Sequence, residues 1–420
     1  MSARVRFGRG LARIGFVTSL VVAASSAACS SSDGDKSSAC AGEPVDRFKE
    51  LLVVDPSVLD DARTLNSTNG PWSFRHAFTE LAAPGVDPSS IVIDWLDEWG
   101  ATREVNGYPV ELPAPASIRD VRMTSNVICP WLKLDPANGC DDQCTTCTAK
   151  KLPLDKAPFR LIAIVNRLDL HENDTVGGAG EARLVFALTD GPADDPRSPA
   201  RPMTLILEYR VPDTITAGEW ARAWHGLGKH TFFDEGYKAD LQHLTDAFTS
   251  RNVSPARTNG SALSQLRTND GFLHWVWQLR EFHLGADDGR LHHAPLANTP
   301  SPSLNGSAVL RSYVTDNASA IQRDNYRIPR ELLPGAIDSQ GFTWVLPGVD
   351  EKLRHAFALG TCNGCHASEV GSIFDKPFHV NPTVRGVEGL SLFLNNPSDP
   401  EHDQLAKRAA LLRTSACGTN

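Results

Sequence analysis

The sequence predicts an α+β protein: a large mixed or antiparallel sheet domain with helices, followed by a small all-α segment. Hydrophobic residues make up 41% and charged residues 22% of the 420-residue chain, which suffices for a packed core. Short apolar runs typical of strands lie between residues 159 and 282, and helical periodicity returns near the C-terminus. We therefore divide the chain into a signal peptide (1–28), a flexible tether (29–43), an α+β domain of unknown function (44–347) and a C-terminal segment (348–420).

The first 28 residues have the layout of an export signal. Four arginines precede an apolar stretch from Ile14 to Ala28, and no acidic residue occurs before position 33. The stretch is short and basic on one side only, which is typical of a signal peptide rather than a membrane-spanning helix. The segment ending at Cys29 resembles the lipobox of bacterial lipoproteins, which predicts lipidation of Cys29 and anchoring to a membrane of the cell envelope, at the outer membrane or the periplasmic face. Ser26 stands where leucine is usual, so simple secretion remains the alternative.

The central domain is expected to hold several strands and two clear helices. Nearly continuous apolar runs predict the first three strands, and alternation of apolar and polar residues predicts a fourth. The spacings suit an antiparallel or mixed sheet. The expected elements are strands at 159–165, 183–188, 204–209 and 275–282, and helices at 219–224 and 237–249.

No motif assigns a reaction to the central domain, so the sequence leaves open whether the protein is an enzyme. The chain contains no G-x-S-x-G elbow, no phosphate-binding P-loop and no HExxH zinc motif. Polar residues such as Arg167, Asp169 and His171 follow the first expected strand, where binding groups often lie. A solvated turn is the commoner explanation for such residues. The net charge of −9 gives no electrostatic indication of a nucleic-acid partner.

Six cysteines lie outside Cys29 and outside the motif described below. An even number suits up to three disulfides in an exported protein, although the sequence does not determine their pairing. Four of the six are clustered and would alternatively hold zinc through thiolates, but the oxidising compartment favours disulfides. Cys40 and Cys417 would join the two ends of the chain if they pair. The six are Cys40, Cys129, Cys140, Cys144, Cys147 and Cys417.

The clearest chemical signal is the segment Cys362-Asn363-Gly364-Cys365-His366. Two cysteines separated by two residues and followed by histidine form the attachment pattern for c-type haem. Cys362 and Cys365 would bind the porphyrin through thioethers, giving one covalent haem c, and His366 would be the proximal ligand of the iron. In this respect the segment resembles bacterial c-type cytochromes.

Two helices are expected around this motif. Asp350 can cap a helix that runs to Gly360 and leads directly into Cys362. Residues 398–401, Ser-Asp-Pro-Glu, form a capping box for a second helix that presents Leu405 and Leu412 on one side. This arrangement resembles the class I cytochrome c fold, in which the two helices pack together, so residues 348–420 are expected to form a cytochrome c-like, haem-binding segment.

The distal side departs from that family, because all three methionines of the chain precede the motif. His379 is therefore the preferred sixth ligand of the iron, and His402 is the second choice. Ligation by two histidines would give a lower reduction potential than ligation by histidine and methionine. Lys376 and Arg385 are the candidates to pair with the haem propionates.

Several segments of the chain, at 158–167, 265–269 and 279–282, resemble an uncharacterised family of exported bacterial lipoproteins. The resemblance covers most of the mature chain and implies a location, but no activity. Three hypotheses remain: an anchored haem protein that transfers electrons to a redox partner protein, an oxidoreductase whose central domain binds substrate while the haem relays electrons, and a non-haem surface lipoprotein. In the last, the motif and His379 bind zinc, or Cys362 and Cys365 form a disulfide.

Overall fold

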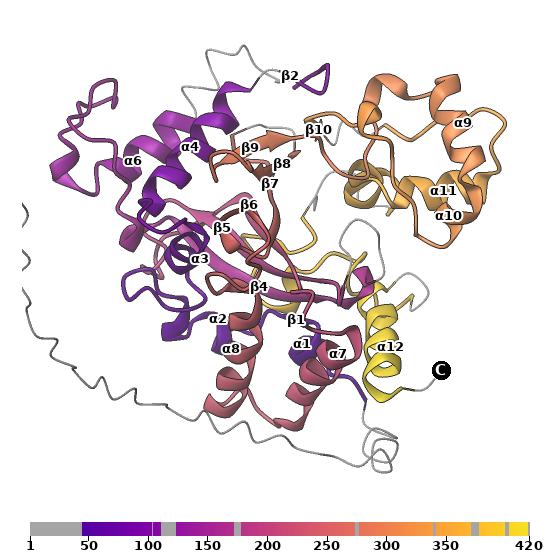
Figure 1. Ribbon diagram of the computed structural model, residues 1–420, viewed down its shortest axis with the longest axis horizontal. Helices are drawn as coiled ribbons and strands as arrows, with labels where there is room; N and C mark the ends of the chain where they lie inside the picture. Colours follow the sequence, from indigo (N-terminus) through magenta and orange to yellow (C-terminus); the bar gives the residue numbers. More distant parts are fainter. Residues whose placement is uncertain are drawn as a thin grey trace, which may run out of the picture.

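The computed structural model describes residues 44–102, 104–110, 123–171, 178–273, 277–338, 342–370, 378–399 and 403–418. At its centre lies an eight-stranded sheet in the order β1-β4-β5-β6-β7-β8-β10, with β9 also paired to β8 (Figure 1). Every pair of neighbouring strands is antiparallel. The prediction of a large sheet domain with helices is therefore confirmed, in its antiparallel form. The strands are β1 Leu52–Val53, β4 Phe159–Arg167, β5 Glu181–Thr189, β6 Ala200–Arg210, β7 Leu263–Asp270, β8 Gln278–Leu284, β9 Leu291–Ala294 and β10 Ala336–Asp338, while β2 Glu104–Val105 and β3 Tyr108–Pro109 pair separately.

Sequence periodicity located most of the sheet. The first three expected strands lie within β4, β5 and β6, and the fourth overlaps β8. Strand β7 was not expected, because most of its residues are polar and its two apolar side chains, Leu263 and Leu266, are not spaced by two. The two expected helices are α7 Ala217–His225 and α8 Glu235–Thr249.

One face of the sheet is apolar and carries the main core. Phe159 of β4 stacks on Phe74 of α3, with ring centroids 4.6 Å apart. Trp95 of α4 meets Phe282 of β8 edge-on at 6.3 Å. Burial of such large aromatic surfaces is the main source of stability for this layer. The helices before β4 are α1 Arg47–Glu50, α2 Pro56–Leu59, α3 Phe74–Leu81, α4 Pro88–Ala101 and α6 Cys129–Leu132.

The opposite face of β4 to β8 is polar, and the C-terminal part of the chain covers it. Arg183 on β5, Glu208 on β6 and Arg267 on β7 lie on this face, together with residues of the last helix. That helix, α12 Gln404–Cys417, packs against α7, and its Leu405 and Leu412 belong to the same core as the sheet (Figure 1). Helix α12 thus shares the main hydrophobic core with the sheet.

A second, smaller core lies in a helical lobe beside the sheet (Figure 1). It is built from α9 Ala308–Asp316, α10 Ala318–Gln322 and α11 Glu351–Leu359, which pack on one another around Trp344 and Phe357. Helix α11 begins after Asp350, as expected, and Asp350 accepts hydrogen bonds from the backbone amides of Lys352 and Leu353. The lobe therefore begins well before residue 348.

The expected packing of the two flanking helices on each other is not what the structure describes. Helix α11 packs against α9 and α10, whereas α12 packs against α7. The start of α12 also differs from the expectation of a capping box at residues 398–401. Asp403 caps this helix instead, because its side chain accepts a hydrogen bond from the amide of Ala406 at 2.9 Å while it also pairs with Arg47.

Two disulfides close the loop that follows α6. Cys129 is bonded to Cys144, and Cys140 is bonded to Cys147. Cys417 is disulfide-bonded as well, and its suggested partner Cys40 lies outside the described residues. Within the described part of the chain, no helix combines the length and the apolar character needed to cross a membrane.

Candidate functional site

The motif at residues 362–366 lies in a helical turn directly after α11, where the helical lobe meets the sheet. Residues Gly364–Ser368 form one wide helical turn of the π type. Trp344 anchors the entry to this turn, because its indole nitrogen donates to Thr361 Oγ1 at 2.9 Å and to Asn363 Oδ1 at 3.2 Å. The backbone amide of Cys362 donates to Thr299 Oγ1 at 2.9 Å. These buried hydrogen bonds fix the positions of both cysteine backbones.

Gly364, between the two cysteines, allows the turn to fold back onto α11. A Cβ atom at this position would overlap the carbonyl oxygen of Ala358 in the last turn of the helix. The backbone amide of Cys365 donates to the carbonyl of Thr361 at 2.9 Å, which continues the helical path through the motif. Glycine is therefore required here for close approach of two backbone segments rather than for a positive φ.

The turn and the segment after residue 377 bring the side chains of Cys365, His366 and His379 together, and Trp277 packs beside them. The rings of His366 and His379 stack with centroids 4.0 Å apart, and Trp277 stacks on the other side of His366 at 4.6 Å. Sγ of Cys365 lies 3.1 Å from Nε2 of His379. The preferred sixth ligand of the sequence analysis thus contacts the motif directly.

His379 is held in place from two further sides. Its Nδ1 lies 3.0 Å from Ser391 Oγ, and its ring stacks on Phe393 with centroids 4.8 Å apart. The hydrogen bond to Nδ1 leaves Nε2 as the nitrogen that points toward the motif, which is the arrangement seen at metal-ligating histidines.

Both the thiol and the imidazole are neutral in this environment. Burial raises the pKa of Cys365 well above its usual range, and the neighbouring Cys362 raises it further. Burial lowers the pKa of His379, and the neighbouring His366 and Arg408 lower it further. A cysteine, a histidine and a serine in line are also the layout of an activated nucleophile, but these pKa directions oppose formation of a thiolate. The thiol of Cys365 therefore donates to His379.

A cavity of about 330 Å³ opens between the motif and the polar face of the sheet. Its walls include Cys362, Cys365, His366 and His379 on one side, and side chains of β4 to β8 on the other. Phe378 and Phe393 add apolar surface. The volume lies within the range of cofactor and small-molecule pockets, which combine apolar walls with a few placed polar groups.

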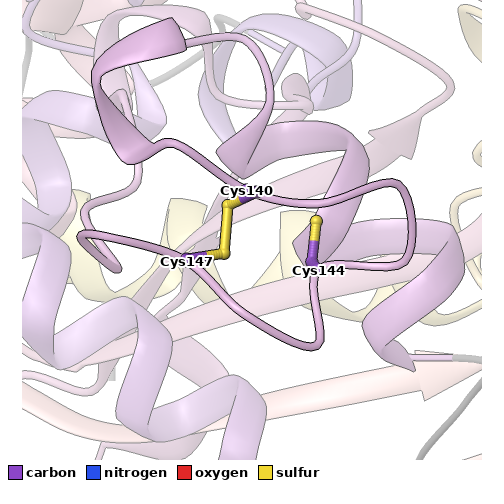
Figure 2. Close-up of side chains that lie close together, drawn as sticks. All are labelled: Cys140, Cys144 and Cys147. Atoms are coloured by element: carbon purple, nitrogen blue, oxygen red, sulfur yellow. A yellow bond between two sulfur atoms is a disulfide. The ribbon is translucent and has the colours of Figure 1, made fainter.

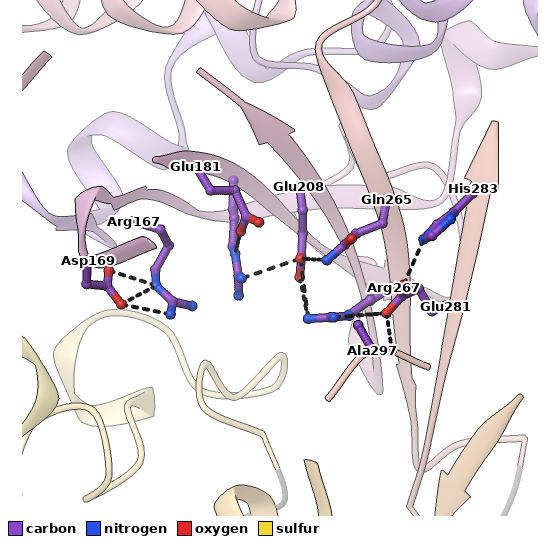
Figure 3. A network of polar contacts seen from close by, with 10 residues as sticks. Arg167, Asp169, Glu181, Glu208, Gln265, Arg267, Glu281, His283 and Ala297 are labelled. Carbon is purple, nitrogen blue, oxygen red and sulfur yellow. Dashed lines mark hydrogen bonds and ion pairs between the residues drawn. The ribbon is translucent and has the colours of Figure 1, made fainter. Parts of the chain in front are cut away.

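The sheet wall of this cavity is a chain of ion pairs (Figure 3). Arg183 pairs with Glu181 and, at 3.4 Å, with Glu208, and Arg267 also pairs with Glu208 at 3.4 Å. Arg267 pairs in addition with Glu281 at 2.9 Å. The side chains of all three glutamates are 1% exposed or less, so each depends on these arginines for compensation of its buried charge.

Buried charges shift the titration of this wall in opposite directions. Burial raises the pKa of Glu181, and the neighbouring Glu208 adds to that effect. Burial also opposes ionisation of Glu281, but the charge of Arg267, the hydrogen bond with His283 and the amide of Ala297 together outweigh it and lower the pKa of Glu281 to about 2. The wall therefore combines one carboxyl group that resists ionisation with one that favours it.

The motif does not form a compact metal site in the described part of the chain. Cys362, Cys365, His366 and His379 offer no three donor atoms within 4.8 Å of one another. The one described group that meets this criterion is Cys140, Cys144 and Cys147, and these cysteines are all in disulfides. Figure 2 shows the bond between Cys140 and Cys147. Cys362 and Cys365 are free thiols and form no disulfide with each other.

The remaining predicted site residues lie elsewhere. Arg385 is at the surface, where it pairs with Asp60 at 2.7 Å, and it does not line the cavity, so its expected role as a propionate partner is not supported. His171 is held by the carbonyl of Leu168 at 2.7 Å, as a turn residue would be. Cys29, Lys376 and His402 lie outside the described residues.

Sequence reasoning missed the sheet wall and one residue of the last helix. Arg183, Glu208 and Arg267 face the cavity from three neighbouring strands, and Arg408 of α12 lies opposite them. The available signal was a charged residue in an otherwise apolar strand, as at Arg183 in β5 and Glu208 in β6. Such a charge indicates either an exposed face or a lined cavity, and only the fold decides between these two.

The chain was compared with protein-family models, with curated proteins and with solved structures. None of the three comparisons found a match, so the candidate site rests on the residues and geometry described above.

Proposed function

We propose that this chain is an exported, lipid-anchored protein that carries one covalently bound haem c and transfers electrons to or from a redox partner protein. Cys362 and Cys365 would hold the porphyrin, and His366 and His379 would be the axial ligands. When bound, the haem would supply reversible one-electron chemistry at its iron.

One observation carries this proposal. Every other described cysteine is in a disulfide, yet Cys362 and Cys365 remain thiols beside a cavity that His366 and His379 also line. Attachment of haem c consumes two thiols and needs a histidine directly after them. Among the described cysteines, the two without a disulfide are therefore the two that haem attachment would use.

The donor set suits a haem, and one contact has to open before a porphyrin can lie between the two histidines. His379 is neutral and presents Nε2, the form in which imidazole ligates iron. The arginines of the cavity wall are suited to carboxylates such as propionates. The His366 and His379 rings now touch, so binding between them requires movement of the segment 378–393 that carries His379.

A zinc site built from the same residues has less support. Zinc prefers four donors in a tight tetrahedron, with its cysteine ligands as thiolates. Here the donors do not converge, and burial raises the pKa of both cysteines.

An oxidoreductase is the second candidate function, and the cavity favours it. The space beside the motif extends over Glu181, Arg183 and Glu208 of the sheet, so a polar substrate would have room and charged partners there. In that case the sheet wall would bind the substrate and the haem would relay electrons.

Detection of covalently bound haem would distinguish the two haem proposals from the non-haem hypothesis. The full chain would be exported in a host that matures c-type cytochromes, denatured, and stained for haem on a gel, with a pyridine haemochrome spectrum as the second measurement. We expect a stained band and a shifted α-band. A band that stains only for protein would contradict both haem proposals.

The role of His379 has its own test. His379→Ala should keep the covalent haem but change the spectrum from six-coordinate low-spin to five-coordinate or water-ligated. His355→Ala is the matched control, because His355 lies in the middle of α11, where it contacts Glu369, and does not line the cavity. An unchanged spectrum in His379→Ala would rule out His379 as the sixth ligand.

The lipid anchor is tested separately. Replacement of Cys29 by Ala should shift the protein from the membrane fraction to the soluble fraction and abolish incorporation of labelled palmitate. Membrane association that persists without Cys29 would contradict lipidation at this residue.

A further inference from the structure

Arg408 of α12 is the least compensated charge in the cavity wall. Its side chain is 8% exposed, and its Nε atom donates no hydrogen bond. In the part of the chain that the structure describes, its ion-pair partner is Asp169, at the long distance of 3.4 Å. Asp169 is already engaged by Arg167, which donates two hydrogen bonds of 3.0 Å and one of 2.8 Å to its carboxylate. Arg408 therefore shares a carboxylate that another arginine holds more closely.

The other arginines of the wall are matched by carboxylates of their own. Arg267 lies 2.9 Å from Glu281, and Arg183 is hydrogen-bonded to Glu181. A buried guanidinium without a close anion costs folding free energy, because its hydration is lost without full replacement. Burial and the nearby charge of Arg167 lower the pKa of Arg408 to about 10, so the side chain is still a cation at neutral pH. The cavity thus has, on the side of α12, a positive charge that is only partly compensated.

The position of this charge points to a ligand. Arg408 lines the same cavity as Cys365, His366 and His379, and Arg167 lies beside it in the wall. A guanidinium presents its donors in a planar fork that matches a carboxylate in two parallel hydrogen bonds. Such a ligand would supply the hydrogen-bond acceptor that Nε lacks and would neutralise the charge.

We propose that Arg408, supported by Arg167, binds a carboxylate group within the cavity. The carboxylate has two possible sources: a propionate of the haem, which rests on the proposed function, or a small carboxylate ligand that enters the cavity on its own. Arg408 would then take the role that the sequence suggested for Lys376 and Arg385.

The first experiment uses full-length protein exported in a host without cytochrome c maturation, so that disulfides form but no haem is attached. Titration with sodium propionate in a calorimeter should show saturable binding. Arg408→Gln should weaken this binding about 10- to 100-fold, the usual loss when a charged hydrogen-bonding partner is removed. Arg408→Lys should recover part of it, since the charge remains but the fork is lost. Arg413→Gln, at an exposed position of the same helix, is the control and should bind as the wild type does.

The second experiment repeats the titration on haem-loaded protein. Loss of propionate binding would show that a haem propionate occupies the site, whereas retained binding would show a separate carboxylate ligand. In the loaded protein, Arg408→Gln should also lower the reduction potential, because it removes a positive charge near the iron, and Arg413→Gln should not.

The proposal is overturned if haem-free wild type binds no propionate, or binds it as weakly as folded Arg408→Gln does. Circular dichroism and the thermal midpoint establish that each variant is folded. Absence of covalent haem would contradict the proposed function but would leave the haem-free titration, and hence this proposal, intact.

Discussion

The chain contains two Cys-x-x-Cys segments, and the structure treats them in opposite ways. Cys147 bonds to Cys140 of the same loop (Figure 2), and Cys144 bonds to Cys129 of α6, so the two bridges interleave along the chain. Cys362 and Cys365 have the same spacing but remain thiols in a helical turn beside a cavity. Spacing alone therefore does not determine what two cysteines do.

The surroundings explain the difference. The loop of residues 135–149 is organised by local hydrogen bonds, such as those from Thr145 and Thr146 to Asp141, and it brings Cys140 to within bonding distance of Cys147. The motif turn is held by Trp344 and Thr299, which belong to other parts of the chain. These contacts orient the two thiols toward the cavity rather than toward other cysteines. The first pair staples a loop, and the second is available for chemistry.

The largest expected effect separates the two pairs by cofactor content. In a host that matures c-type cytochromes, Cys362→Ser with Cys365→Ser should lose all covalent haem. Cys144→Ser with Cys147→Ser should keep a haem-staining band, since that loop does not line the cavity. Equal loss of the stain in both double variants would mean that haem content depends only on correct folding. The proposed difference between the two cysteine pairs would then be contradicted.

Acid should weaken the ion-pair wall of the cavity while the disulfide bonds stay intact, because disulfides do not titrate. Burial opposes ionisation of Glu281, yet Arg267, His283 and the amide of Ala297 together lower its pKa from the ordinary 4.5 to about 2. A carboxylate with a depressed pKa stabilises the fold above about pH 4.5, and this contribution is lost as the pH falls toward 2. We expect the free energy of unfolding, measured with urea, to fall across this window while disulfide mapping stays unchanged. A stability that is constant between pH 5 and pH 2.5 would contradict the ion-pair wall.

Removal of one bridge should weaken the fold even without haem. Cys129 and Cys144 are 15 residues apart, and closing a loop of that length stabilises a protein by about 3 kcal/mol. Cys129→Ser with Cys144→Ser should therefore lower the free energy of unfolding of the haem-free protein by about that amount in urea titrations. Cys362→Ser with Cys365→Ser is the matched control and should change it little, because no bond is lost.

The smallest effect concerns the glycine between the two thiols. Gly364→Ala should destabilise the protein by about 1–3 kcal/mol, the usual cost of forcing a methyl group into a packed site. Gly226→Ala, at the end of α7, is the control, since a Cβ there meets nothing within 4 Å. Equal thermal midpoints for the two variants would show that the motif turn has more room than its backbone contacts indicate.

The sequence was most informative where one local pattern determines the outcome. Apolar runs located β4, β5 and β6, and Asp350 located the start of α11. The absence of a later methionine directed attention to His379, which the fold then places against the motif. Each of these inferences needs only a short stretch of chain.

The failures involve residues that distant contacts position. Strand β7 has polar residues on its cavity face, so its alternation did not stand out. Arg385 pairs with Asp60 at the surface, whereas the arginines that line the cavity come from three strands of the sheet and from α12. A cavity wall is a property of tertiary packing, and hydrophobic periodicity does not encode it.

The cavity also depends on nearly the full length of the described chain. Its lining runs from Leu52 of β1 to Arg408 of α12, so the cavity is complete only when the first strand and the last helix are both in place. A chain cut before α12 would keep the motif, the sheet and the helical lobe but would lose the side of the cavity that carries Arg408.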